Sequence, residues 1–104
     1  METSTDVTVA HNRERQRFEA TVDGRLVGFA DYRPRDGALA FTHTEVDPAA
    51  RGRGIGGVLV GAALDAVRAE GGRVLPLCSF VADYVARNPA YADLVAHRPD
   101  PGGA

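Results

Sequence analysis

The sequence has no lysine, and all 12 of its basic residues are arginines. Its formal net charge of −2 argues against a general nucleic-acid-binding protein, which would be strongly basic. The only cysteine, Cys78, cannot form an internal disulfide, and this favours a reducing compartment. Three scattered histidines and one cysteine do not make a metal site, so we expect no metal.

Long apolar segments are missing as well. No stretch is long enough to cross a membrane, and residues 1–6 are polar and acidic, unlike a signal peptide. These absences predict a cytoplasmic protein with no membrane or nucleic-acid partner. The hydrophobic fraction of 44% is sufficient for one globular domain. We expect that domain over residues 1–96 and a disordered tail over residues 97–104, which contain two prolines and two glycines.

The first half of the chain predicts an antiparallel meander of four strands. The strands are expected near residues 7–9 and over 15–22, 25–32 and 39–46, with turns at 11–14, 23–24 and 34–37. Asp23-Gly24 is typical of a two-residue type I′ turn, which needs positive φ at both positions. In the fourth strand, strict alternation would place one set of side chains on a single face: Leu39, Phe41, His43 and Glu45.

A long helix is predicted over residues 54–70, ended by Gly71. Its apolar residues form two stripes: Ile55, Val58, Leu59, Ala62 and Ala66 in one, and Val60, Leu64 and Val67 in the other. Such a helix should be covered both by the sheet and by another element or subunit. Gly56, Gly57 and Gly61 each lower helix propensity by about 0.5–1 kcal/mol, so ligand binding or close helix–sheet packing must offset that cost.

The remaining elements are short. A crossover connection predicts that residues 74–77 form a fifth strand parallel to the fourth, with the pairing interrupted at Pro76 because proline has no N–H to donate. Ser79 is placed to cap a helix over residues 80–87, and residues 91–95 form a final turn.

The junction between the fourth strand and the long helix is the most informative stretch. Arg51-Gly52-Arg53-Gly54-Ile55-Gly56 combines bare backbone N–H groups, the partial positive charge of a helix start and two guanidinium groups. This combination suits a phosphate or pyrophosphate. No Gly-Lys-Ser or Gly-Lys-Thr follows, so the loop is not of the Walker type. An RNA-binding Arg-Gly segment is disfavoured too, because the Arg-Gly unit is not reiterated.

Arg51, Gly54 and Gly56 match the coenzyme A pyrophosphate loop of the GNAT superfamily of N-acetyltransferases. Three further stretches strengthen the match: His43-Thr44-Glu45-Val46, Pro76-Leu77-Cys78-Ser79-Phe80 and Asn88-Pro89-Ala90-Tyr91. From residue 14 to residue 95 the chain resembles the minimal single-domain GNAT-like acetyltransferases. The resemblance implies an α+β fold in which the fourth and fifth strands splay apart and the first two are joined by a turn. It also implies coenzyme A contacts at Val46, Arg51, Gly52, Arg53, Gly54, Ile55, Gly56 and Gly57.

Three side chains are candidates for catalysis. Cys78 follows the fifth strand and precedes a helix, whose start favours a thiolate. It would accept the acyl group as a thioester or line the pocket, and the alternative is a small buried apolar residue. His43 and Glu45 lie two residues apart on one strand, and either could deprotonate an amine. The alternatives are a semi-buried structural histidine and a solvated carboxylate.

Tyr84 and Arg87 lie on the last predicted helix. Tyr84 is offset from the tyrosine that larger GNAT enzymes use as a general acid, so a position in the pocket wall is favoured. Arg87 could reach a coenzyme A phosphate or interact with the helix C-terminus. His11 and His97 are expected in a turn and in the tail, and neither is given a role.

The leading hypothesis is an acetyl-CoA-dependent N-acyltransferase acting on a small-molecule or peptide amine. The alternative is a coenzyme A or acyl-CoA binding module without transfer activity. Because the first two strands lack the intervening helices of larger GNAT enzymes, we expect an open acceptor site. The sequence leaves the acceptor, the acyl chain and homo-oligomerisation undetermined.

Overall fold

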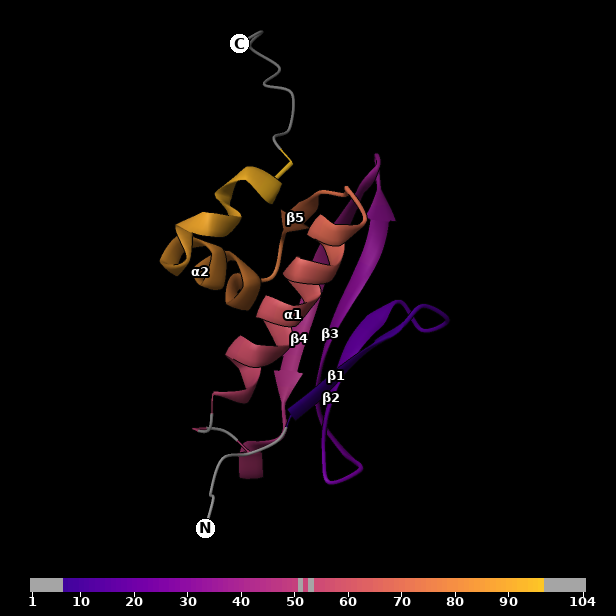
Figure 1. The fold of residues 1–104 in the computed structure, drawn as a ribbon, viewed down its shortest axis with the longest axis vertical. Coiled ribbons are helices and arrows are strands. Elements are labelled where there is room, and N and C mark those ends of the chain that lie inside the picture. Colours follow the sequence, from indigo (N-terminus) through magenta and orange to yellow (C-terminus); the bar gives the residue numbers. More distant parts are fainter. Residues whose placement is uncertain (1–6, 51, 53, 97–104) are drawn as a thin grey trace, which may run out of the picture.

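The computed structural model describes residues 7–50, 52 and 54–96. Five strands form one sheet in the order β1-β2-β3-β4-β5, antiparallel except for the parallel pair β4 and β5. The strands are β1 Val7–Asn12, β2 Arg17–Val22, β3 Arg25–Arg35, β4 Ala38–Val46 and β5 Val74–Pro76. The helices are η1 Pro48–Ala50, α1 Ile55–Ala69, α2 Ser79–Arg87 and η2 Pro89–Leu94. Figure 1 shows α1 lying against the sheet, with α2 beside it.

The predicted meander is confirmed, but its first turn lies at residues 13–16 instead of 11–14, and its third turn is shorter than expected. His11 belongs to β1 and pairs with Phe18, because the side chain of Asn12 accepts a hydrogen bond from the Arg15 N–H and tightens the turn. The next hairpin turns at Asp36-Gly37 alone, with φ of 51° and 82°. Asp23-Gly24 has φ of 52° and 79°, as the type I′ prediction requires.

The predicted face of β4 is wrong after Phe41. Tyr32 pairs with Phe41 and Asp31 pairs with His43, so Thr42 has no partner and forms a bulge. A bulge reverses the alternation of side chains beyond it. Phe41 therefore packs in the core beside Tyr32, whereas His43 points to the opposite face of the sheet. We call that face, which neither α1 nor α2 covers, the uncovered face.

Helix α1 has the predicted extent and ends in a Schellman motif. Gly71 has φ of 72°, its N–H donates to the Arg68 carbonyl, and the Gly72 N–H donates to the Val67 carbonyl. The helix buries Leu59 and Leu64 completely. The residues of the two predicted apolar stripes are buried or half-buried, except Val58, which is 47% exposed.

The second element that covers α1 is α2, within the same chain. Gly56 contacts the ring of Phe80, and Gly57 and Gly61 face the ring of Tyr84. Close helix–sheet packing, one of the two explanations left open for Gly61, is therefore wrong: this glycine permits close approach of two helices. Helix α2 begins at Ser79 with Cys78 as its N-cap residue, so the predicted Ser79 cap is also wrong.

Strand β5 is short because it contains a proline. It pairs with β4 only from Leu39 to Phe41, and Pro76 is its last residue. The Cys78 N–H then donates to the Phe41 carbonyl, after which the chain enters α2. Beyond Phe41, β4 continues for five residues without β5, which confirms the predicted splay.

A double-mutant cycle tests the contact between the helices. A methyl group added at Gly61 would lie 2.7 Å from the Tyr84 hydroxyl oxygen but 3.5 Å from the nearest ring carbon. We expect Gly61→Ala to destabilise the parent chain and to stabilise a Tyr84→Phe chain, where the propensity gain of alanine, about 0.5–1 kcal/mol, is retained. Urea denaturation should give a coupling energy of at least about 0.5 kcal/mol. Additive effects would contradict this packing.

Candidate functional site

A cleft lies where β4 leaves β5 and α1 begins. It has a volume of about 500 Å³.

 Its walls are residues 43–46 of β4 on one side, and Gly52 with residues 54–57 on the other. Phe80 of α2 closes one end. We call this hollow the helix-start cleft. It brings together Val46, Gly52, Gly54, Ile55, Gly56 and Gly57 of the predicted coenzyme-binding set.

The glycine loop owes its shape to positive backbone angles. Gly52 and Gly54 have φ of 87° and 74°, a region that strains any residue with a Cβ. Gly54 is the N-cap of α1 and provides no side-chain cap, so the first N–H groups of the helix have no side-chain acceptor there. Such a helix start fits an anionic group. The predicted contacts Arg51 and Arg53 lie outside the described residues.

Phe80 separates the helix-start cleft from a second hollow of about 410 Å³. Its ring lies against Gly56, and its side chain is partly exposed. Tyr84 and Arg87 line the second hollow. The Tyr84 hydroxyl is directed at Gly61, so Tyr84 is a wall residue in this arrangement, as the sequence favours.

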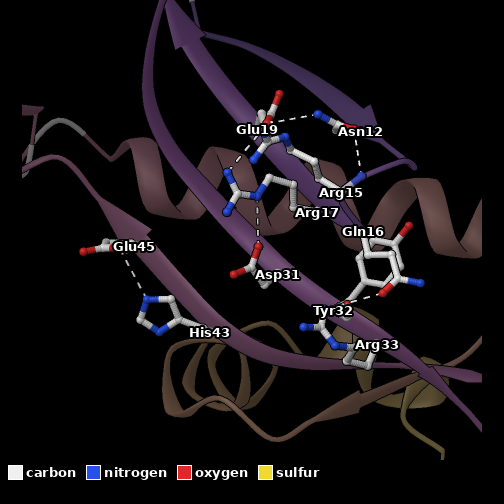
Figure 2. A network of polar contacts seen from close by, with 10 residues as sticks. All are labelled: Asn12, Arg15, Gln16, Arg17, Glu19, Asp31, Tyr32, Arg33, His43 and Glu45. Atoms are coloured by element: carbon white, nitrogen blue, oxygen red, sulfur yellow. Dashed lines mark hydrogen bonds and ion pairs between the residues drawn. The ribbon is translucent and has the colours of Figure 1, made fainter.

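His43 and Glu45 come together on the uncovered face. His43 Nε2 lies 3.4 Å from Glu45 Oε1, and both side chains are more than half exposed. Figure 2 shows this pair beside Asp31, which is opposite His43 in the sheet. Asp31 accepts a hydrogen bond of 3.0 Å from Arg17 Nε, and the Arg17 guanidinium lies over the ring of Phe29.

Cys78, which precedes α2, lies on the side of β4 that faces the helices. Its thiol is partly buried and donates to the Thr44 hydroxyl oxygen over 3.6 Å. The three catalytic candidates therefore form two groups, with β4 between them: Cys78 on the helix side, and His43 with Glu45 on the uncovered side.

Sequence reasoning missed the roles of Thr44 and Phe80 in shaping this site. Thr44 faces Cys78 only because the Thr42 bulge reverses the alternation of β4. Phe80 had a detectable signal: a large apolar residue in the first turn of one helix, in a chain with adjacent glycines, Gly56 and Gly57, in the first turn of another.

Comparison with known proteins gives the family. Residues 17–94 match a family model described as GCN5-related N-acetyl-transferase. The chain belongs to this family. It is 35% identical over 92 residues to Protein NATD1 of Xenopus tropicalis, covering 86% of this chain and 84% of the relative. It is 36% identical over 86 residues to Protein NATD1 of Mus musculus, covering 80% and 77%.

Solved structures of the GCN5-related family share the fold. The solution structure of a GCN5-like protein from Staphylococcus aureus superposes with a TM-score of 0.66 at 18% identity, covering 93% of each chain. A ribosomal-protein-alanine N-acetyltransferase from Brucella melitensis gives a TM-score of 0.51 at 19% identity, covering 92% of this chain and 94% of that one. At these identities the likeness establishes the fold alone.

Two negative findings apply to the described residues. Within residues 7–50, 52 and 54–96, no helix is long and apolar enough to span a membrane. Over the same residues, no three side chains of the His, Cys, Asp and Glu types are grouped as metal ligands.

Several groups away from the cleft have shifted pKa values, among them Tyr91, Asp93 and His11. A hydrogen bond to Asp65 raises the pKa of Tyr91 to about 12, and a hydrogen bond from Arg68 lowers the pKa of Asp93. These contacts fix η2 on α1. Near the C-terminal end of β1, burial lowers the pKa of His11. The His11 ring is hydrogen-bonded to the Tyr32 hydroxyl over 2.5 Å and is stacked on the ring of Phe18.

The burial of His11 predicts a pH-dependent stability. Because its folded-state pKa lies below the ordinary value of 6.5, protonation favours the unfolded chain. The free energy of unfolding should therefore fall as the pH drops below about 6.5 towards the folded-state pKa. The melting temperature should change less between pH 7.5 and pH 5.5 for His11→Gln than for the parent chain, because glutamine keeps a polar group but does not titrate. An equal difference in both proteins would contradict this account.

Proposed function

We propose that this chain transfers an acetyl group from acetyl-CoA to an amine. The observation that carries the proposal is the helix-start cleft, which joins the end of β4 that β5 does not reach to a glycine-rich helix N-terminus. The family supports an acetyltransferase, and the finer assignment of co-substrate and acceptor is ours.

The residues of the cleft fit coenzyme A in two respects. The backbone N–H groups at the start of α1 would hold the pyrophosphate, helped by the helix dipole. The splayed end of β4 leaves room beside Val46 for an extended arm. Phe80 lies at the end of the cleft, so we expect its ring to contact the bound arm or to turn away from Gly56.

The reaction needs an amine in its neutral form. The amine nitrogen forms the new bond to the acyl carbon, the carbon–sulfur bond breaks, and the sulfur leaves with the electron pair as the thiolate of coenzyme A. His43 or Glu45 would take the proton from the nitrogen, directly or through water. The thioester supplies the activated acyl group, and the protein supplies position.

The surroundings of Cys78 support direct transfer rather than an acyl-cysteine intermediate. A nucleophilic cysteine is activated by a base within hydrogen-bond reach or by a helix start, and Cys78 has only the second of these, as the N-cap residue of α2. The hydrogen-bond partner of Cys78 is the Thr44 hydroxyl, which is no base, and His43 lies on the other face of β4. We therefore assign Cys78 to the wall of the acyl pocket.

The first test of this function is stabilisation by coenzyme A. Ligand at a hundred times its dissociation constant adds about 2.7 kcal/mol to the free energy of unfolding. Gly54→Ala should weaken this increment. Gly71→Ala is the matched control, because Gly71 has nearly the same φ, 72° against 74°, at the other end of α1. Both variants should lose intrinsic stability, but only Gly54→Ala should lose ligand response. A melting temperature indifferent to millimolar coenzyme A would refute the proposed site.

The second test separates the catalytic candidates. Under direct transfer, His43→Ala or Glu45→Gln should lower the transfer rate by about 10²–10⁴-fold if that residue is the base, with coenzyme A affinity unchanged. Cys78→Ser should keep most activity. Mass spectrometry of the protein with acetyl-CoA and an amine library gives the readout. An acyl-Cys78 adduct that forms within one turnover and passes to amine would overturn the direct route. Binding of coenzyme A with no transfer would favour the alternative of a binding module.

A further inference from the structure

A separate groove lies on the uncovered face at the end of β4. It has a volume of about 220 Å³, and the side chains that line it include Leu26, Phe29, Glu45, Asp47 and Pro48. Glu45 and Val46 line both this groove and the helix-start cleft, so the two hollows adjoin at β4. We call it the acceptor groove.

The apolar part of the groove depends on a second bulge. Ala20 pairs with Gly28 and Thr21 pairs with Leu26, so Val27 has no partner in β2. The bulge allows Val27 to be buried while Leu26 shares the uncovered face with Phe29. Leu26 is 48% exposed, although a leucine in this position could have joined the core under regular alternation.

The charge of the groove is negative. Glu45 has His43 as its ion-pair partner, and no arginine of the described residues pairs with Glu45 or Asp47. Asp47 accepts a hydrogen bond from the Ala49 N–H, which fixes its carboxylate at the end of the groove. The Arg17 guanidinium lies over one face of the Phe29 ring, 3.9 Å from its centre, and is engaged by Asp31 at 3.0 Å, so its charge is largely offset.

These features select a class of ligand. Glu45 and Asp47 favour an ammonium group and disfavour a carboxylate, since like charges repel. Leu26, Phe29 and Pro48 favour one apolar group beside it. A volume of about 150 Å³ accommodates benzene in a protein cavity, so the groove has room for one ring or a branched aliphatic group.

We propose that the acceptor groove binds a primary amine that carries one apolar group of about ring size and no adjacent carboxylate. The ammonium would lie at Glu45, next to the helix-start cleft, and the apolar group would lie on Leu26 and Phe29. The proposal rests on the proposed transfer function and specifies its acceptor.

The binding test needs neither coenzyme A nor turnover. Phenethylamine is titrated into the isotope-labelled protein, and the chemical shifts of Leu26 and Phe29 are followed by NMR. Three matched probes each remove or add one feature: 2-phenylethanol lacks the charge, ethanolamine lacks the ring, and phenylalanine adds a carboxylate. We expect phenethylamine to bind most tightly and each of the others to bind several-fold more weakly.

Three variants localise the binding. Leu26→Ser should weaken phenethylamine binding by about three- to tenfold through lost apolar contact. Val58→Ser is its matched control, because Val58 is 47% exposed but lies on α1 and lines neither hollow, and binding should be unchanged. Glu45→Gln should reduce the preference for phenethylamine over 2-phenylethanol.

The outcomes separate this proposal from the transfer function. Equal binding of all four probes, or equal effects of Leu26→Ser and Val58→Ser on binding, would refute amine binding in the acceptor groove even if acetyl transfer occurs. Selective binding of phenethylamine at Leu26 without any acetyl transfer would support amine binding in the acceptor groove and refute the proposed transfer function. With transfer active, kcat/KM should follow the same order of amines. A peptide with an N-terminal phenylalanine distinguishes a peptide acceptor from a free amine.

Discussion

The early end of the pairing between β4 and β5 is the constraint on which the rest of the structure depends. Pro76 has no N–H to continue the ladder, and the Cys78 N–H returns to the Phe41 carbonyl before α2 begins. Had β5 continued, its backbone would occupy the space beside the end of β4. Instead that space is the helix-start cleft, and α2 packs along the glycines of α1.

Features set by local backbone chemistry were predictable from the sequence. Positive φ at Asp23-Gly24, the ends of α1 at Gly54 and Gly71, and the interruption at Pro76 each follow from one or two residues. The bulge at Thr42 was not predictable in this way. It exists because Phe41 joins Phe18 and Tyr32 in the core, and an alternation within one strand carries no information about the register of its neighbour.

The same distinction applies to the candidate site. The glycine loop was recognisable because its requirements, positive φ and an open helix start, lie within six consecutive residues. The contacts of Cys78 with Thr44 and of Phe80 with Gly56 join residues more than 20 positions apart, and their geometry depends on the bulge and on the packing of α2. The sequence therefore indicated many of the residues that line the candidate site, but neither the roles of Thr44 and Phe80 nor which side chains share a face.

The two bulges give β3 and β4 different chemistry on their two faces. On the helix side, Phe41 and Val27 complete the core. On the uncovered side, Leu26 and His43 are brought out beside Phe29 and Glu45. A sheet face without helices must be polar enough to remain in water, and the pairing of Arg17 with Asp31 meets that requirement without covering Glu45. A chain of 104 residues can thus present two adjoining hollows along the same strand, and Glu45 and Val46 line both of them. In the function proposed above, these two residues lie where the co-substrate and the acceptor would meet.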